Sequence, residues 1–369
     1  MQHAARRGLE RGPARYAAIV AVLALACAAR ESTTPLIIDD LVAASASPST
    51  RDGRVVLVTI DGVRWQEVFE GSSPEFSGRP AVSPAELMPR TAKLVASRGV
   101  ALGATMPGCG TVHTAGASNV SLPGYTEIFT GHASHCLDNS CAQVPESVLD
   151  EAARVDPDAG AASIGAWEVL SRAVSGGQEG VFVSVGRSWP EGARGSAALA
   201  ELFAVGQAAD PYPGHGWYRP DTATAAIALA YYREAAPALF HIGLGDTDEY
   251  GHRGEYVSYL DALTRADTMI GALADLLDTM GAVGEKTTVI ITADHGRNSD
   301  FVNHGVFHPE SGRSFVIAFG GNVPVNGIAC PRRDLTLADI APTIRVLMGL
   351  PRDTSDGAGK AIELVIGPS

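Results

Sequence analysis

The chain has few basic residues for its length, and this shortage excludes one large class of function. Of its 369 residues, 28 are lysine or arginine and 41 are aspartate or glutamate, so the formal net charge is -13. A nucleic-acid-binding surface needs clustered lysine and arginine that displace the counterions of phosphates. We therefore expect no nucleic-acid-binding surface. The carboxylates instead suggest metal sites, because a cation can neutralise a buried acidic cluster.

The sequence also lacks an apolar run long enough to span a membrane comfortably. The run at residues 16–29 (YAAIVAVLALACAA) is shorter than the ~20 residues that a membrane-spanning helix needs. Four arginines precede this run and small residues end it, which is the pattern of a secretory signal peptide. We predict a signal peptide at residues 1–29 and export to the periplasm or the extracellular space. A lipid anchor at Cys27 stays open as an alternative, because Cys27 follows an imperfect lipoprotein cleavage motif.

Cysteine is scarce, with five in the whole chain. Without Cys27 an even number remains, which is compatible with two disulfides in an oxidising compartment. Cys136 and Cys141 are close enough in sequence to pair, which leaves Cys109 and Cys330. We expect residues 30–52 to form a linker, residues 53–355 one domain and residues 356–369 a C-terminal tail.

No internal repeat is evident, and strand-like runs alternate with helical stretches. The predicted strands cover residues 54–60, 180–185, 238–244, 287–292 and 314–319. This alternation predicts an α/β fold, with a doubly wound and mostly parallel sheet flanked by helices. Ligands bind such sheets beyond the carboxyl ends of the strands. Residues 135–215 carry few strand signals, and we expect them to include a loop-rich cap or long loops over that edge.

Carboxylates and imidazoles follow several of these strands. Asp61 comes directly after the strand at 54–60, while Asp294 and His295 follow the strand at 287–292. Taken alone, Asp61-Gly62 is more typical of a turn than of a ligand site. The same topology, however, brings all three side chains to one edge of the sheet.

A second candidate group lies after the strand at 238–244. Asp248 and His252 are four residues apart, so in a helix both share one face and can bind one cation. A helix cap with a surface histidine is the plainer interpretation of this pair. His304 completes the group, and carboxylates with imidazoles are donors that Zn²⁺ accepts.

A nucleophile is available at residues 119–131 (NVSLPGYTEIFTG). Ser121 stands on a turn restricted by proline and glycine, just before a helix-like stretch. A helix N-terminus offers free N–H groups and partial positive charge to a phosphate. A bound metal would lower the pKa of the Ser121 hydroxyl. Thr126 and Thr130 are alternative hydroxyl groups.

In their order along the chain, the candidate residues resemble the pattern of the alkaline phosphatase superfamily, particularly its nucleotide pyrophosphatase/phosphodiesterase branch. These residues are Asp61, Ser121, Asp248, His252, Asp294, His295 and His304. The resemblance covers roughly residues 54–351. It implies two Zn²⁺ ions per chain and a covalent phosphoserine at Ser121. One ion would be held by Asp248, His252 and His304, and the other by Asp61, Asp294, His295 and the Ser121 oxygen. His308 competes with His304, but Gly305 after His304 matches the family.

Two differences from the patterns of related enzymes reduce the number of reactions that the sequence allows. Gly243 stands where alkaline phosphatase-type monoesterases carry a glutamate for a third metal, and Tyr125 stands where the sulfatase signature has arginine. Among residues that could bind substrate, Asn139 resembles the phosphoryl-binding asparagine of the diesterases, although a turn between paired cysteines explains it equally well. Arg64 could contact substrate or form a salt bridge at the rim.

The predicted function is therefore a secreted two-zinc phosphoric ester hydrolase, either a phosphodiesterase or a phosphatase, acting on a small-molecule phosphate ester. Two alternatives stay open. One is a phosphoryl transferase resembling the cofactor-independent phosphoglycerate mutases, and the other is a non-catalytic surface binding module on the same fold.

Overall fold

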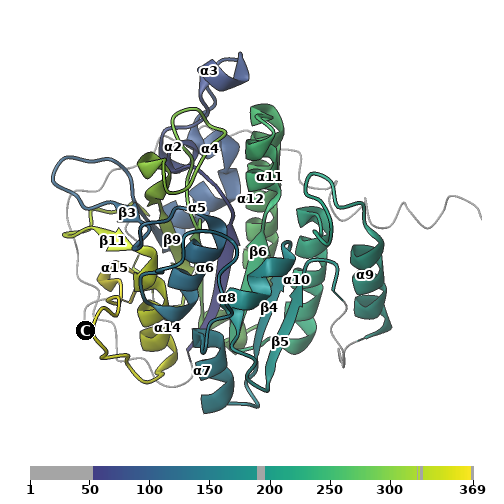
Figure 1. Ribbon diagram of the computed structural model, residues 1–369. Helices are drawn as coiled ribbons and strands as arrows, with labels where there is room; N and C mark the ends of the chain where they lie inside the picture. Colours follow the sequence, from purple (N-terminus) through teal and green to yellow (C-terminus); the bar gives the residue numbers. More distant parts are fainter. Residues whose placement is uncertain (1–52, 189–195, 322, 325–326, 367–369) are drawn as a thin grey trace, which may run out of the picture. The chain divides into compact units, whose positions relative to one another are not determined.

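The computed structural model describes residues 53–188, 196–321, 323–324 and 327–366, which are built around an eight-stranded sheet (Figure 1). Its strands are β1 (Arg54–Ile60), β2 (Gly99–Leu102), β4 (Ala161–Gly165), β5 (Val181–Val185), β6 (Leu239–Leu244), β7 (Thr287–Thr292), β9 (Val316–Gly320) and β10 (Gly327–Ile328). They lie in the order β10-β2-β9-β7-β1-β6-β4-β5, and β9 alone among them runs against the others. A smaller sheet joins β11 (Leu335–Thr336), β3 (Val112–His113) and β8 (Arg313–Ser314) in that order. The predicted α/β fold with a mostly parallel sheet is confirmed.

Helices cover both faces of the large sheet. The α-helices are α2 (Trp65–Phe69), α3 (Pro74–Ser77), α4 (Pro84–Leu87), α5 (Pro89–Arg98), α6 (Ser121–Thr130), α7 (Val148–Val155), α8 (Ser171–Val174), α9 (Ala197–Ala208), α10 (Asp221–Ala235), α11 (Asp246–His252), α12 (Tyr256–Thr279), α13 (Ala282–Glu285), α14 (Ile340–Met348) and α15 (Glu363–Ile366). Short 3-10 turns lie at η2 (Glu168–Leu170), η3 (Pro309–Gly312) and η4 (Leu337–Asp339). Among the described residues, no helix is long and apolar enough to cross a membrane.

The alternation of side chains along β1 explains the two layers of helices. Val55 and Leu57 belong to one apolar core, which includes residues of α6, α7, α8 and α14. Val56, Val58 and Ile60 belong to a second core, with residues of α5, α9, α10 and α12. Because successive side chains of a strand point to opposite faces, one buried strand supplies both cores. Figure 1 shows α6 and α14 in front of the sheet and α12 behind it.

The centre of the sheet fixes where the candidate site lies. β1 is hydrogen-bonded in parallel to β7 on one side and to β6 on the other. Thr59 is opposite Thr292 of β7, and Ile60 is opposite Leu244 of β6, so the three strands end together. The segments that follow them therefore share one edge.

Two sequence predictions need correction, and one is confirmed. The range 135–215 is not only a cap, because it also holds two strands of the sheet: β5, which was predicted at 180–185, and β4, which was not. The sequence of β4 (AASIG) has few β-branched residues and therefore carries little strand signal. The predicted tail includes α15, where the buried Ile362 and Val365 join the core.

The disulfides Cys136–Cys141 and Cys109–Cys330 are both present. The predicted signal peptide, Cys27 and the linker at 30–52 lie outside the described residues.

Candidate active site

Asp61, Asp294 and His295 meet at the carboxyl ends of β1 and β7. The Nε2 atom of His295 lies 3.5 Å from Asp61 Oδ1 and 3.5 Å from Asp294 Oδ2. One ligand atom from each of the three residues falls within 4.8 Å of the others, and all three side chains are buried. The structure thus brings together the first of the two predicted ligand groups.

Asp248, His252 and His304 form the second group, beyond the end of β6. The helix α11 places Asp248 and His252 on one face, where His252 Nε2 is 3.0 Å from Asp248 Oδ2. His304 Nε2 lies 3.1 Å from His252 Nε2 and 3.9 Å from Asp248 Oδ1. The ring of His304 also stacks on His295 with 3.9 Å between centroids, so the two groups adjoin.

Backbone carbonyl groups orient two of these imidazoles. His295 Nδ1 lies 2.8 Å from the carbonyl oxygen of Gly296, and His304 Nδ1 lies 2.8 Å from that of Asn119. A carbonyl only accepts, so Nδ1 carries the proton in each ring and Nε2 presents a lone pair. This arrangement, in which an outer partner fixes the tautomer, is typical of metal-ligating histidines.

The carboxylates differ in their electrostatic surroundings. Burial, followed by the charges of Asp294 and Asp248, raises the pKa of Asp61 well above its ordinary value. Burial together with Asp248 raises the pKa of Asp294 to about 8. Burial also acts to raise the pKa of Asp248, but Arg297, with His252 and His304, holds it well below its ordinary value. Two of the three carboxyl groups therefore lack a compensating positive charge.

A divalent cation fits this donor set. Asp294 Oδ2 is buried and accepts no hydrogen bond from the described residues. Crowded carboxylates with raised pKa values and imidazole lone pairs are groups that a cation stabilises in their deprotonated form. The metal would replace the protons that the free site retains.

Ser121 is the first residue of the ten-residue helix α6 and lies beside the first ligand group. Its Oγ is 3.2 Å from His295 Nε2 and 3.5 Å from Asp61 Oδ1. Gly124, in the first turn, allows this approach, because a Cβ there would lie 2.2 Å from the carbonyl oxygen of Asp294. A hydroxyl, a helix N-terminus and two ligand groups therefore converge.

The two predicted substrate-binding residues have different positions. Asn139 is exposed, and its Oδ1 accepts a hydrogen bond of 2.9 Å from the backbone N–H of Leu122, next to Ser121. Arg64 is buried, and its Nε lies 3.3 Å from Gln66 Oε1 and 3.7 Å from Glu67 Oε2. The structure thus shows a salt bridge for Arg64, the alternative that its sequence left open, although a buried one, while contact with substrate stays a prediction.

Three residues at the site were missed by the sequence patterns. Tyr125 donates a hydrogen bond of 3.1 Å from its hydroxyl to Asp61 Oδ2. Arg297 donates to the carboxylate of Asp248. Gly62 has a positive φ of 65°, and its N–H donates to Asp294 Oδ1 at 3.1 Å. Tyr125 is four residues after Ser121, so helical periodicity could have placed both on one face; Arg297 has no such signal.

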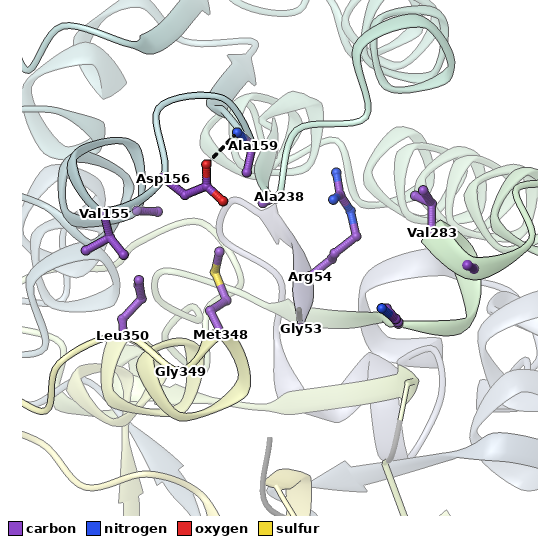
Figure 2. A pocket seen from close by; sticks show the side chains of 13 residues that line it. Gly53, Arg54, Val155, Asp156, Ala159, Ala238, Val283, Met348, Gly349 and Leu350 are labelled. Atoms are coloured by element: carbon purple, nitrogen blue, oxygen red, sulfur yellow. Dashed lines mark hydrogen bonds between the residues drawn. The ribbon is translucent and has the colours of Figure 1, made fainter. Parts of the chain in front are cut away.

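A cavity of about 370 Å³ lies at the other end of the sheet and is not this site (Figure 2). It is lined by residues that include Arg54, Ala238 and Lys286, which stand at or just before the amino ends of β1, β6 and β7. Asp61 follows the carboxyl end of β1, seven residues further on. The ligand groups, rather than the cavity, therefore define the candidate active site.

Comparisons with known proteins agree with the fold. A family model described as the metalloenzyme superfamily matches residues 219–352, which hold the candidate ligands from Asp248 onward. A 2,3-bisphosphoglycerate-independent phosphoglycerate mutase from Gloeothece citriformis is 30% identical over 151 residues, which cover 39% of this chain and 26% of that protein. The chain thus spans about a quarter of the length of that relative.

Solved structures share the fold over a larger part of the chain. The alkaline phosphatase PafA superposes with a TM-score of 0.56 at 13% identity, covering 88% of this chain and 100% of that chain. The phosphonate monoester hydrolase of Agrobacterium radiobacter gives a TM-score of 0.54 at 15% identity, covering 85% of this chain and 77% of that chain. At these identities the likeness is one of fold.

Proposed function

We propose that the chain is a two-zinc phosphoric ester hydrolase, because a metalloenzyme superfamily model matches residues 219–352 and the fold is similar to that of an alkaline phosphatase. The superfamily implies a divalent metal; zinc is proposed because the donors are carboxylates and imidazoles. Asp61, Asp294 and His295 would hold one ion together with the Ser121 oxygen. Asp248, His252 and His304 would hold the other.

One observation carries this proposal: Ser121 Oγ lies within 3.5 Å of both His295 Nε2 and Asp61 Oδ1 at the start of a helix. Metal ions at these ligands would lower the pKa of the hydroxyl and neutralise charge on the phosphoryl oxygens. In the first turn of α6, Pro123 has no N–H group, and the N–H groups of Leu122 and Gly124 already donate to Asn139 and to the carbonyl oxygen of Val120. The helix would therefore offer a bound phosphate the N–H of Ser121 and the partial positive charge of its N-terminus. Asn139, whose side chain accepts the N–H of Leu122, would orient a phosphoryl oxygen.

The reaction then has two displacements. Ser121 Oγ attacks phosphorus, a Ser121–phosphorus ester bond forms, and the bond to the leaving oxygen breaks as that oxygen takes a proton. A water molecule next attacks the phosphoserine, the bond to Ser121 Oγ breaks, and Ser121 regains its proton. The products are an alcohol and a phosphate or phosphate monoester, according to the substrate.

We place the protein outside the cytoplasm, in the periplasm or the extracellular space. The two disulfides support this location, because such bonds persist in oxidising compartments. The proposed substrate is a small-molecule phosphate ester, and the proposal includes no nucleic-acid-binding surface. A lipid anchor at Cys27 remains the alternative to simple cleavage of the signal peptide.

A phosphoryl transferase is the second candidate, since a phosphoglycerate mutase is among the relatives. Both activities would use Ser121, but they differ in the acceptor. A hydrolase passes the phosphoryl group to water, whereas a mutase returns it to a hydroxyl group of the substrate. Incubation in ¹⁸O-labelled water distinguishes them, because only hydrolysis places the label in released phosphate.

The test uses the exported form of the protein with p-nitrophenyl phosphate, bis-p-nitrophenyl phosphate, a phosphonate ester and a sulfate ester. We expect two bound zinc ions, hydrolysis of a phosphate ester, and loss of activity with a chelator. Ser121→Ala should lower kcat at least about 10³-fold. Thr126→Ala, on the same helix, is the matched control. A metal-free protein that hydrolyses none of these esters would contradict the proposal.

A further inference from the structure

A row of buried polar side chains crosses the sheet and ends at Asp61. Ser163 on β4 stands opposite His241 on β6, and His241 stands opposite Leu57 on β1, two residues before Thr59. Ser163, His241 and Thr59 have no exposed surface. Polar groups buried this deeply are costly unless each is hydrogen-bonded, so their partners are informative.

Each of these side chains is bonded to the next. Ser163 Oγ lies 2.8 Å from His241 Nδ1, and His241 Nε2 lies 2.9 Å from Thr59 Oγ1. The Thr59 side chain also interacts with the Tyr125 hydroxyl and acts to lower the pKa of Tyr125. Tyr125 in turn donates to Asp61 Oδ2. The row therefore runs from β4 through β6 to β1, where it adjoins Tyr125 of α6 and its hydrogen bond to Asp61.

Asp61 is the last acceptor of the row, and its chemistry determines which group donates in each hydrogen bond of the row. As a metal ligand the Asp61 carboxylate is ionised and only accepts, so the Tyr125 hydroxyl donates to Asp61 and its oxygen is free to accept from Thr59. Thr59 then accepts from the Nε2–H of His241, which leaves Nδ1 to accept from Ser163. Burial lowers the pKa of His241 to about 3, so the ring is neutral and carries the single N–H that this direction needs.

We propose that Tyr125, held by the row of Thr59, His241 and Ser163, is a positioning residue that fixes the Asp61 carboxylate as a metal ligand. This inference rests on the proposed function for the identity of the ligand. With Oδ2 bound by Tyr125, the orientation of the carboxylate is set before a metal arrives. Removing an outer partner of this kind typically costs 10–100-fold in metal affinity.

Tyr125 also fills space in the core, and the experiment must separate that role from positioning. The ring lies 6.5 Å from the ring centroids of both Phe129 and Trp167. Tyr125→Phe keeps the ring and removes only the hydroxyl. Tyr232→Phe is the matched control, because Tyr232 is also buried and its hydroxyl is bonded to Thr287 Oγ1, at the amino end of β7.

The readout is zinc affinity of each site, measured in full-length protein by competition with a chelating dye. We expect Tyr125→Phe to weaken one of the two sites by about 10–100-fold and to leave the other unchanged. Tyr232→Phe should leave both unchanged. Thr59→Val should weaken the same site less strongly, and Thr59→Ser, which restores a hydroxyl, should recover the affinity.

The results of this experiment distinguish failure of the positioning role from failure of the proposed function. If the wild-type protein binds zinc and Tyr125→Phe binds it equally tightly at both sites, the positioning role is wrong, whatever the activity. If Tyr125→Phe weakens one site while the wild-type protein hydrolyses no phosphate ester, positioning is supported and the proposed function fails. A wild-type protein that binds no divalent metal overturns both.

Discussion

The guanidinium group of Arg297 bonds to Asp248 twice, through the carboxylate and through the backbone carbonyl oxygen, the latter at 2.7 Å. Both residues are buried, and Arg297 also donates to the carbonyl oxygen of Val302 at 2.6 Å. A Cβ on Gly251 would lie 2.2 Å from the guanidinium carbon, so the approach requires glycine. Asp248 is thus the one carboxylate of the site with a fixed cation beside it.

Removal of Arg297 should destabilise the metal-free protein strongly. Arg297→Met leaves Asp248 as an uncompensated buried charge, a change that typically costs about 3–5 kcal/mol. The loss should be smaller with zinc bound, because a metal ion also compensates Asp248. Urea unfolding with and without zinc measures both values. The control is Arg98→Met, whose ion pair with Asp278 is exposed and should contribute at most about 1 kcal/mol. Equal losses in the two variants would contradict the role of Arg297.

Gly124→Ala should lower activity although alanine is the better helix former. Propensity alone favours alanine by about 0.5–1 kcal/mol. The new Cβ, however, would lie 2.2 Å from the carbonyl oxygen of Asp294. Rotation of a side chain cannot relieve this contact, because the Cβ is fixed to the backbone of α6 and the oxygen belongs to the backbone of Asp294. We expect α6 to shift and Ser121 with it, and a displacement of about 1 Å can cost 10²-fold in rate. Steady-state kinetics, with Thr126→Ala as the control, measures this; unchanged kcat would show that α6 tolerates the contact.

Glu127, in the middle of α6, should make stability fall as pH rises. Burial, opposed by hydrogen bonds from the backbone N–H groups of Ala115, Ser134 and Gly116, raises the pKa of Glu127 from 4.5 to about 7. The folded protein therefore binds more protons than the unfolded chain between these values, so the free energy of unfolding decreases across this window. The decrease is roughly 3 kcal/mol, and it is complete above about pH 7.

Glu127→Gln isolates this contribution. The amide does not titrate, so the difference in unfolding free energy between the wild-type protein and the variant should decline by roughly 3 kcal/mol from about pH 4.5 to pH 7. Urea unfolding at half-unit pH intervals provides the comparison. A constant difference across the window would mean that Glu127 is ionised in the folded protein throughout.

The disulfide Cys136–Cys141 should support activity through Asn139. It closes a short loop around Asn139, whose side chain bonds to Leu122 beside Ser121, the proposed nucleophile. Replacing both cysteines by serine should lower kcat/KM by about 5–30-fold, equivalent to the loss of one or two kcal/mol of positioning. Asn139→Ala should have a similar effect, and the combined variant should not be additive.

The second disulfide serves as the control for this prediction. Cys109–Cys330 joins segments 221 residues apart in sequence, just before β3 and β11. Replacing these two cysteines by serine should lower the melting temperature but leave kcat/KM within about twofold, because loop closure acts on the unfolded chain. Equal losses of kcat/KM in both pairs would point to general destabilisation.

The sequence predicted those parts of the site that follow from strand topology. Asp61 and Asp294 could be placed together because each follows a β-branched run, and parallel strands end at one edge of a sheet. The spacing of Asp248 and His252 predicted a shared helix face, and α11 has them so. These predictions use local patterns only, which explains their success.

Contacts that depend on tertiary packing were not predictable in this way. Nothing near Arg297 indicates a bond to a residue 49 positions earlier. The partner of Arg64 could not be identified from the sequence, because Glu67 is polar in sequence yet buried in the fold, where Tyr256 and Tyr259 also bond to it. The strand β4 was missed because alanine, serine and glycine carry little strand propensity, and the neighbouring β5 and β6 stabilise it.

Because β7, β1 and β6 are neighbouring strands, the spacing between strands determines the distances between the candidate metal ligands that follow them. Neighbouring strands lie about 4.8 Å apart, and Asp61 and Asp294 follow strands that are direct neighbours. Their separation is therefore set by the same hydrogen bonds that hold the sheet together. Asn139, in contrast, belongs to a surface loop that can change in length or composition without altering this distance. The positions of the proposed metal ligands and of the proposed substrate-binding residue Asn139 are thus set by separate parts of the chain.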